Sequence, residues 1–171
     1  MRCNLNFNQC YLSPYYPEPI FTCRRNILLA ILNSTNVVIN PTTAFALLSS
    51  ATTQTVADDG NVVTTFIAGS GNSVNVDGSG NITLSPGTYR VSYTVMATLP
   101  AGGNMSSALY LNGTEVSSSQ STATGTAGNA GVLANTSTIT IPAGGGTLRL
   151  VNTSGDSLTV NSANIVITKI G

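Results

Sequence analysis

Hydrophobic and polar residues alternate with a period of two along much of the chain beyond residue 36. The clearest run is 88–97, whose apolar-facing positions are Tyr89, Val91, Tyr93 and Val95 and whose other positions are Arg90, Ser92, Thr94 and Met96. A period of two is that of a β-strand with one face on a core. Shorter runs predict further strands at 44–48, 62–66, 74–76, 81–84, 108–111, 136–141, 147–151 and 163–170.

Turn signals separate these runs. They are Asp59-Gly60, Asp77-Gly78, Pro86-Gly87, Asn112-Gly113 and Gly155-Asp156. Such residues tolerate a positive φ or set a turn corner, and no segment shows a sustained period of 3.6 residues, so we expect an all-β domain. About nine strands with irregular loops favour a jelly roll or an immunoglobulin-like sandwich over a closed barrel. Because the cysteine and tryptophan marks of an immunoglobulin core are missing, we predict a jelly-roll sandwich.

The last predicted strand is apolar on both of its faces. Ala163, Ile165 and Ile167 form one face, whereas Val166 and Ile170 lie on the other. Leu148, Leu150 and Val151 repeat this pattern in a strand that we expect beside it. A strand that is apolar on both sides meets protein on both sides, so we predict that Val166, Ile170 and Val151 form a subunit interface. The alternative is a strand end that is tucked under a loop of the same chain.

Residues 1–25 have a different composition. They hold all three cysteines, three of the seven prolines and five of the ten aromatic residues. A proline-rich arm cannot bury these rings within itself, so it either binds another subunit or promotes aggregation. We therefore predict a connector between protein units. Its expected contact residues are Cys3, Phe7, Cys10, Tyr11, Tyr15, Tyr16, Phe21 and Cys23.

Three cysteines cannot all pair within one chain. Their placement in the arm suits disulfides between chains, and reduced thiols are the alternative. Zinc is disfavoured, because no two cysteines form a close C-x-x-C pair and the chain has no histidine.

We divide the chain into the connector (1–25), a short apolar linker (26–41) and the β domain (42–171). The start of the chain has no apolar core typical of a secretory signal, and the apolar run 27–32 is too short to cross a bilayer. We therefore expect synthesis without a signal peptide and no membrane partner.

Charge narrows the possible functions. Charged residues make up 7% of the chain, and six acidic residues cancel six basic ones. Nucleic-acid binding needs clustered basic residues, and here only Arg24 and Arg25 are adjacent, so we exclude this function. A neutral chain with so few charges also repels its own copies weakly, so it tends to associate.

Candidate chemistry is sparse. Acid–base catalysis needs a positioned titratable pair, and the chain offers six scattered carboxylates without histidine, so we expect no catalytic residue and no cofactor. The turn 58–61 contains two adjacent aspartates that could contribute to a calcium site. It supplies too few of the six to eight oxygens that calcium takes, so a plain hairpin turn is the preferred interpretation and we expect no metal.

Several motifs, in their order and spacing, resemble a known family. They are Ala44 to Leu48, Thr53 to Ala57, Gly80 to Tyr93, Leu109 to Thr114, Ile141 to Gly144, Leu148 to Asn152 and Ala163 to Ile170. Together they resemble the C1q/TNF-like head of BclA-type spore surface glycoproteins over residues 42–171. The resemblance implies a homotrimer of jelly rolls, with the first and last strands near the threefold axis, on the exterior of a bacterial spore.

The chain departs from this family in one respect. BclA-type proteins carry a collagen-like Gly-X-Y stalk before the head, and here the connector occupies that place. We therefore expect a structural subunit of a spore appendage or exosporium fibre, in which trimers stack head to tail through their connectors, together with an anchoring protein and a tip protein. The alternative is a trimeric surface or tip head, similar to an adhesin, that binds a host or matrix ligand.

Overall fold

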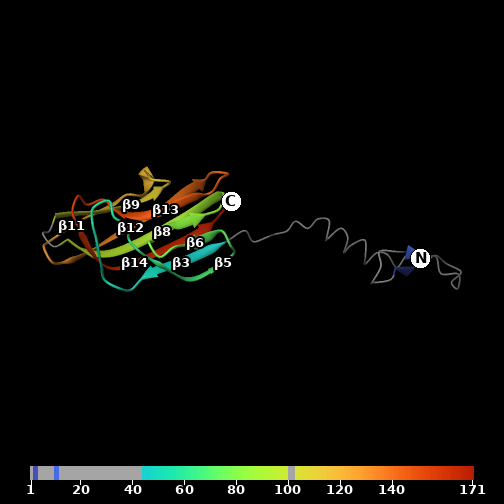
Figure 1. The fold of residues 1–171 in the computed structure, drawn as a ribbon, viewed down its shortest axis with the longest axis horizontal. Helices are drawn as coiled ribbons and strands as arrows, with labels where there is room; N and C mark the ends of the chain where they lie inside the picture. Colours follow the sequence, from blue (N-terminus) through green and yellow to red (C-terminus); the bar gives the residue numbers. More distant parts are fainter. Residues whose placement is uncertain (1, 4–9, 12–43, 100–102) are drawn as a thin grey trace. The chain divides into compact units, whose positions relative to one another are not determined.

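Two antiparallel β-sheets make up the unit Thr42–Gly171, one of the two compact units into which the chain divides. The computed structural model describes residues 2–3, 10–11, 44–99 and 103–171 (Figure 1). In the unit Met1–Pro41, β1 (Arg2–Cys3) pairs antiparallel with β2 (Cys10–Tyr11), and this register sets Cys3 opposite Cys10. The other predicted connector residues, Phe7, Tyr15, Tyr16, Phe21 and Cys23, lie outside the described residues.

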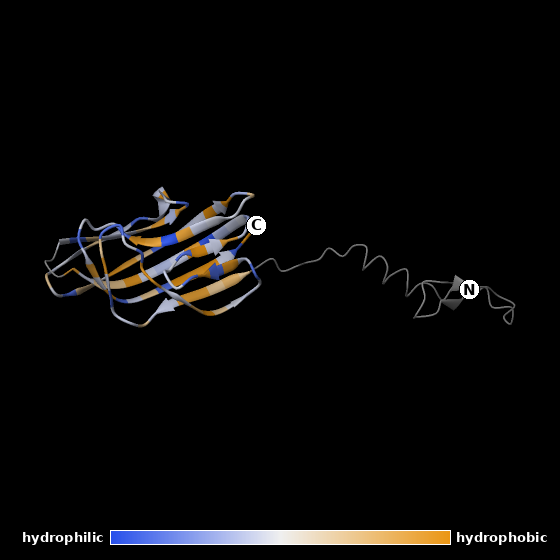
Figure 2. Cartoon of the chain, viewed as in Figure 1, coloured by the Kyte–Doolittle hydropathy of each residue, from blue (hydrophilic) through white to orange (hydrophobic). Residues whose placement is uncertain are grey.

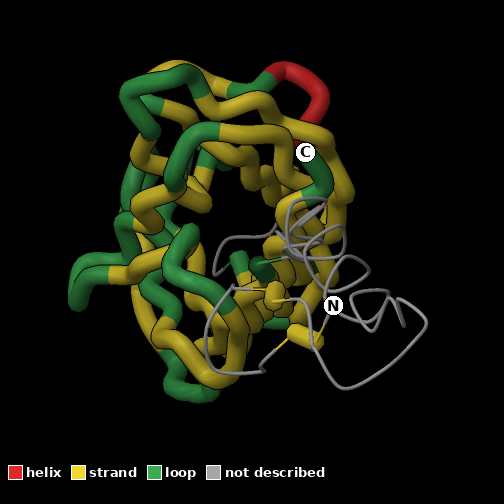
Figure 3. Tube along the Cα trace, turned by 90° about the vertical axis from the view of Figure 1, so that its right-hand side faces the viewer, coloured by secondary structure: helices red, strands yellow, loops and turns green. Residues whose placement is uncertain are grey.

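We name each sheet of the larger unit, the head, after its long strand. The β8 sheet has the order β12 (Ala130–Ile141), β8 (Gly87–Thr98), β14 (Leu158–Lys169), β3 (Phe45–Ser50) and β5 (Thr65–Ser70), and β4 (Gln54–Val56) also pairs with β14. The β9 sheet has the order β10 (Thr114–Glu115), β9 (Gly103–Leu111), β13 (Gly146–Asn152), β7 (Ile82–Leu84) and β6 (Val74–Val76), and β11 (Ser121–Gly125) also pairs with β9. One 3-10 turn, η1 (Ser117–Ser119), follows β10. The predicted all-β sandwich is confirmed, and its strands lie in two layers (Figure 3).

The core lies between the two sheets. Along β8, Tyr89, Val91, Tyr93 and Val95 are buried, and Arg90 on the alternate face is exposed, as the period of two predicts. Leu48 and Ile165 from the same sheet meet Leu109 and Leu148 from the β9 sheet in one apolar cluster. Figure 2 shows the apolar residues, in orange, along the strands of both layers. Burial of this surface is the main force that stabilises the sandwich.

Two buried polar groups tie the layers and loops together. The Tyr93 hydroxyl donates to the carbonyl oxygens of Ser107 (2.9 Å) and Ser119 (2.7 Å), so it links β8 to β9 and to η1. The side-chain amide of Asn152 donates to the carbonyl oxygens of Val56, Ala57 and Asp156 at 2.8 to 3.0 Å. It therefore fixes two loops at the end of β13.

The structure corrects two sequence predictions. The strand predicted at 62–66 runs instead over Thr65–Ser70, because the backbone of Val62 donates to Leu150 and that of Val63 pairs with the Gln54 side-chain amide. The strand expected beside the last one, β13, lies in the opposite sheet, between β9 and β7. Its apolar faces therefore do not extend the surface of β14. Among the described residues, no helix has both the length and the apolar character needed to span a membrane.

Candidate self-association face

The outer surface of the β8 sheet gathers most of the large exposed apolar side chains of the described residues. They are Phe45 on β3, Met96 on β8, Val132 on β12, Val166 on β14, and Ile170 just beyond β14. Phe66 on the edge strand β5 is also exposed, but it lies opposite the buried Leu48 and therefore on the inward side of the sheet. Large apolar side chains that gather on one face of a soluble protein mark a contact surface. We call the outward side of this sheet, with these residues, the association face.

The register of the strands shows which residues flank those of the association face. Val166 lies between Ser92 on β8 and Leu47 on β3, and Val132 lies opposite Met96. Polar residues between them bond to each other, as in the 2.9 Å hydrogen bond that joins the Ser92 and Thr136 hydroxyls. The polar part of the face is thus partly satisfied within the chain, which lowers the cost of covering it.

This face carries little charge. The five strands β12, β8, β14, β3 and β5 contain two charged residues, Arg90 and Lys169, and no carboxylate. The Lys169 ammonium donates to the Pro86 carbonyl oxygen at 2.8 Å, where the chain turns into β8. Burying a charge without a partner is expensive, so a face with apolar side chains and few charges is suited to protein contact.

The structure places the three predicted interface residues differently. Val166 is 43% exposed and Ile170 is 56% exposed, and both belong to the association face. Val151 is 1% exposed, in the β9 sheet. There the segment before β5 runs along the end of β13, because the backbone of Asn152 donates to Gly60 (3.0 Å) and that of Val62 donates to Leu150. Val151 is therefore buried by its own chain and presents no surface in the single head.

One end of the head, where β13 finishes at Asn152, carries negative charge. The Asp58 carboxylate accepts a hydrogen bond from the Gly155 backbone (2.8 Å). The Asp59 backbone donates to the Asn152 carbonyl oxygen, and the Asn152 side-chain amide donates to the Asp156 carbonyl oxygen. We call the loops 57–60 and 153–157 the acidic end. The register places this end at Asn152, whereas Ala44 and the C-terminus lie at the other end, where the Lys169 backbone donates to Ala44 and that of Thr88 to Gly171.

The predicted turn at Asp58 to Asn61 is a turn in the structure. The Gly60 backbone donates to Ala57 (2.9 Å), and Asp59 has the left-handed φ of 58° that an aspartate tolerates. Within the ranges that the structure describes, no group of three acidic, cysteine or histidine side chains could hold a metal ion.

Two titratable groups outside the association face have shifted pKa values. Hydrogen bonds from the Asn81 side chain and from the Asn81 and Ser79 backbones lower the pKa of the exposed Asp77, which closes the turn before β7. Desolvation raises the pKa of Tyr110 on β9, and the carboxylate of Glu115 adds to this rise. Both groups have structural surroundings, so neither indicates catalysis.

Sequence reasoning missed much of the association face. Phe45 and Met96 fell within predicted strands, but nothing in the pattern showed which sheet would remain uncovered. Val132 lies in a Gly- and Ala-rich stretch with a weak strand signal. The one available indication was the two-sided apolar pattern of β14.

Comparisons with known proteins agree with this geometry. The globular domain of zebrafish complement 1qA is similar in structure, with a TM-score of 0.61 at 11% identity over 75% of this chain and 98% of that one. Eiger TNF from S. frugiperda gives a TM-score of 0.59 at 14% identity, over 75% of this chain and 94% of that chain. The PRD1 vertex protein P5 gives 0.51 at 14% identity, over 75% and 98% of the two chains.

No family model matches the sequence, and no curated protein matches it. The structural likeness at such low identity speaks for the fold alone. The strand order, the two-layer core and these neighbours together show that the head is an all-β sandwich with the C1q/TNF-like jelly-roll fold.

Proposed function

We propose that this protein is a structural subunit of a fibre on the surface of a bacterial spore. Three heads associate through the association face, and the trimers stack head to tail through residues 1–25. The spore exterior rests on the resemblance to BclA-type heads, and the observation that carries the self-association is the apolar outer surface of the β8 sheet, which has few charges. An anchoring protein at the base of the fibre and a tip protein complete this proposal.

The apolar side chains of the face support a closed trimer. A heptad or collagen stalk is not needed to hold three heads together if they bury Val166 and Ile170 against one another, since burial of apolar surface drives association. Both residues come from the last strand or just after it, and Phe45 begins β3 beside it. The resemblance to C1q/TNF-like heads implies that the first and last strands meet near a threefold axis.

Charge supports the stacking step. Residues 1–25 contain three basic residues and one acidic residue, a net charge of +2, whereas residues 44–171 contain three basic and five acidic residues, a net charge of −2. The connector precedes the Ala44 end of the head in sequence, and the acidic end is the opposite one. A basic connector is therefore attracted to the acidic end of the next trimer, and contacts between unlike surfaces of this kind continue into a filament instead of closing.

Three connectors at each junction strengthen the stacking. Once one connector is bound, the other two act at a high effective concentration, so a modest affinity for each gives a durable joint. Disulfides between chains through Cys3, Cys10 or Cys23 would lock it further in an oxidising setting.

Deletion of residues 1–25 tests the proposal. We expect the full chain to form fibres of stacked particles in negative-stain electron microscopy, and the deleted chain to form single trimers of the same head. The fibre should also be examined with and without reductant, to show whether disulfides contribute. Fibres of unchanged repeat from the deleted chain would rule out the connector mechanism.

A further inference from the structure

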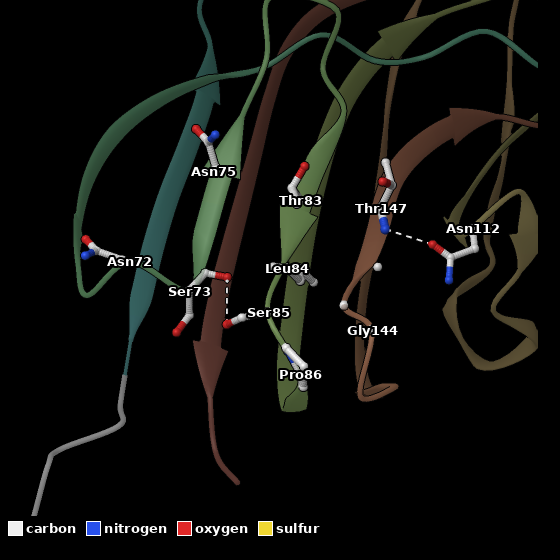
Figure 4. A pocket seen from close by; sticks show the side chains of 12 residues that line it. Asn72, Ser73, Asn75, Thr83, Leu84, Ser85, Pro86, Asn112, Gly144 and Thr147 are labelled. Atoms are coloured by element: carbon white, nitrogen blue, oxygen red, sulfur yellow. Dashed lines mark hydrogen bonds between the residues drawn. The ribbon is translucent and has the colours of Figure 1, made fainter.

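A polar groove on the β9 sheet lies apart from the association face. It has a volume of about 510 Å³ and is formed by β6, β7, the start of β13 and the turns around them (Figure 4). Neither the trimer nor the stacking of trimers uses this surface in the function proposed above. Ligand sites in proteins commonly have volumes of 300 to 1,000 Å³, so the groove is large enough for a small ligand.

The floor of the groove is a row of polar side chains across neighbouring strands. Asn75 on β6 is opposite Thr83 on β7, and Thr83 is opposite Thr147 on β13. Asn112 continues the row, because its side-chain oxygen accepts a hydrogen bond from the Thr147 backbone at 2.9 Å. Neighbouring strands lie about 4.8 Å apart, so the row offers a polar group at each step over roughly 14 Å.

Several of these groups are free to bind. Asn75, Thr83 and Asn112 are exposed, and Thr147 is half-buried. Within the described part of the chain, the hydroxyls of Thr83 and Thr147 have no hydrogen-bond partner. The Asn75 oxygen accepts a bond from the Val76 backbone, which leaves its amide hydrogens free. Each hydroxyl both donates and accepts, and the amides donate, so the row matches a ligand that is itself rich in hydroxyls.

The lining selects against charged ligands. It consists of Asn, Ser, Thr and Gly residues with Leu84 and Pro86, and it contains no charged side chain. The nearby Lys169 ammonium is already engaged with the Pro86 carbonyl oxygen. An anionic ligand would lose water here without gaining a countercharge, which is unfavourable.

The groove also lacks the features that bind peptides. A peptide is held by a long free sheet edge or by apolar pockets. Here β7 is paired on both sides, and the edge strand β6 is only three residues long (Val74–Val76). Leu84 is fully buried, so Pro86 is the one exposed apolar side chain in the lining. Gly144 leaves room instead, since a side chain added there would meet nothing within 4 Å.

We infer that this groove binds a neutral carbohydrate chain through the row Asn75, Thr83, Thr147 and Asn112. Affinity for one groove is low, in the millimolar range, because no aromatic ring is present in the lining to stack on a sugar. A trimer, and still more a fibre, presents many copies of the groove, and this repetition turns weak binding into firm attachment to a glycan surface.

The test compares isosteric variants of the full chain on immobilised glycans. The probes are maltohexaose, cellohexaose and the tetramer of N-acetylglucosamine, with a galacturonate oligomer as the anionic control. The double variant Thr83→Val, Thr147→Val removes two hydroxyls and keeps shape and strand propensity. Thr122→Val, on β11 of the same sheet and outside the groove, is the matched control. Circular dichroism verifies that each variant is folded.

We expect saturable binding of at least one neutral probe, a response weaker by about tenfold or more in the double variant, and no change in the control. Absence of saturable binding to every neutral probe, equal binding of the galacturonate oligomer, or full binding by the double variant would each overturn the inference. A synthetic peptide of residues 1–25 is tested in parallel. If this peptide binds and the double variant abolishes its binding, the groove belongs to the connector and not to a carbohydrate.

Discussion

Replacement of Val166 and Ile170 by serine tests the association face directly. Both side chains are exposed in the single head, so the change removes little from the stability of the fold itself. Full burial of a valine or isoleucine side chain contributes about 1.5 to 3 kcal/mol. Covering the exposed 43% of Val166 and 56% of Ile170 then contributes about 1.5 to 3 kcal/mol for each chain.

A trimer contains three copies of this pair, so their burial stabilises it by about 4.5 to 9 kcal/mol. Each 1.4 kcal/mol is a factor of ten in an equilibrium constant. Serine keeps one carbon of each side chain, so we take the lower bound and expect the trimer association constant to fall on the order of 10³-fold.

Sedimentation of the full chain in reductant, over a series of concentrations, measures this change. The double variant should shift from trimer to monomer at concentrations where the original chain is still trimeric. Thr122→Ala, on an exposed strand of the opposite sheet, should leave sedimentation unchanged. A double variant that remains trimeric over the whole series, with its thermal unfolding unaltered, would show that these residues do not meet another subunit.

Three further changes probe the interior and the acidic end. Asn152→Ala removes the amide that holds three carbonyl oxygens, and at about 1 kcal/mol for each hydrogen bond the free energy of unfolding should fall by about 3 kcal/mol in urea denaturation; a loss under 1 kcal/mol would contradict this role. Burial raises the pKa of Tyr93 above its ordinary value of 10.0, because the neutral hydroxyl is favoured in the fold. The contribution of this pKa shift to the free energy of unfolding is therefore complete below pH 10 and declines as the pH rises above that value. The variant Tyr93→Phe should remove this decline from unfolding curves measured between pH 8 and 12. If attraction to the acidic end guides stacking, the triple variant Asp58→Asn, Asp59→Asn, Asp156→Asn and high salt should each slow fibre growth followed by light scattering, and salt should lose its effect on the variant; equal growth in both would exclude charge as the guide.

Much of the fold could be predicted from the pattern of residues, and the reasons differ from strand to strand. Long strands with clean alternation, such as β8, are specified by their own sequence because one face must be buried. β4 and β10 are too short to show a period of two, and β11 (STATG) contains no large apolar residue. The pairing of these three strands is therefore decided by the strands beside them.

The association face could be predicted only in part from short stretches of sequence. The two-sided apolar pattern of β14 pointed to Val166 and Ile170, which are exposed, and the same argument pointed to Val151, which is buried. The apolar patterns of β14 and β13 look alike in the sequence. Only the packing of the segment 59–62 along β13 distinguishes them, and that contact joins residues about 90 positions apart.

The absence of carboxylates from the five strands of the association face has a consequence for durability. Aspartate, glutamate and histidine are the side chains whose ordinary pKa values lie between about 3.9 and 6.5. Those five strands contain none of them. A trimer held together through these strands would therefore tolerate changes of acidity that dissociate assemblies built on ionised carboxylates or histidines.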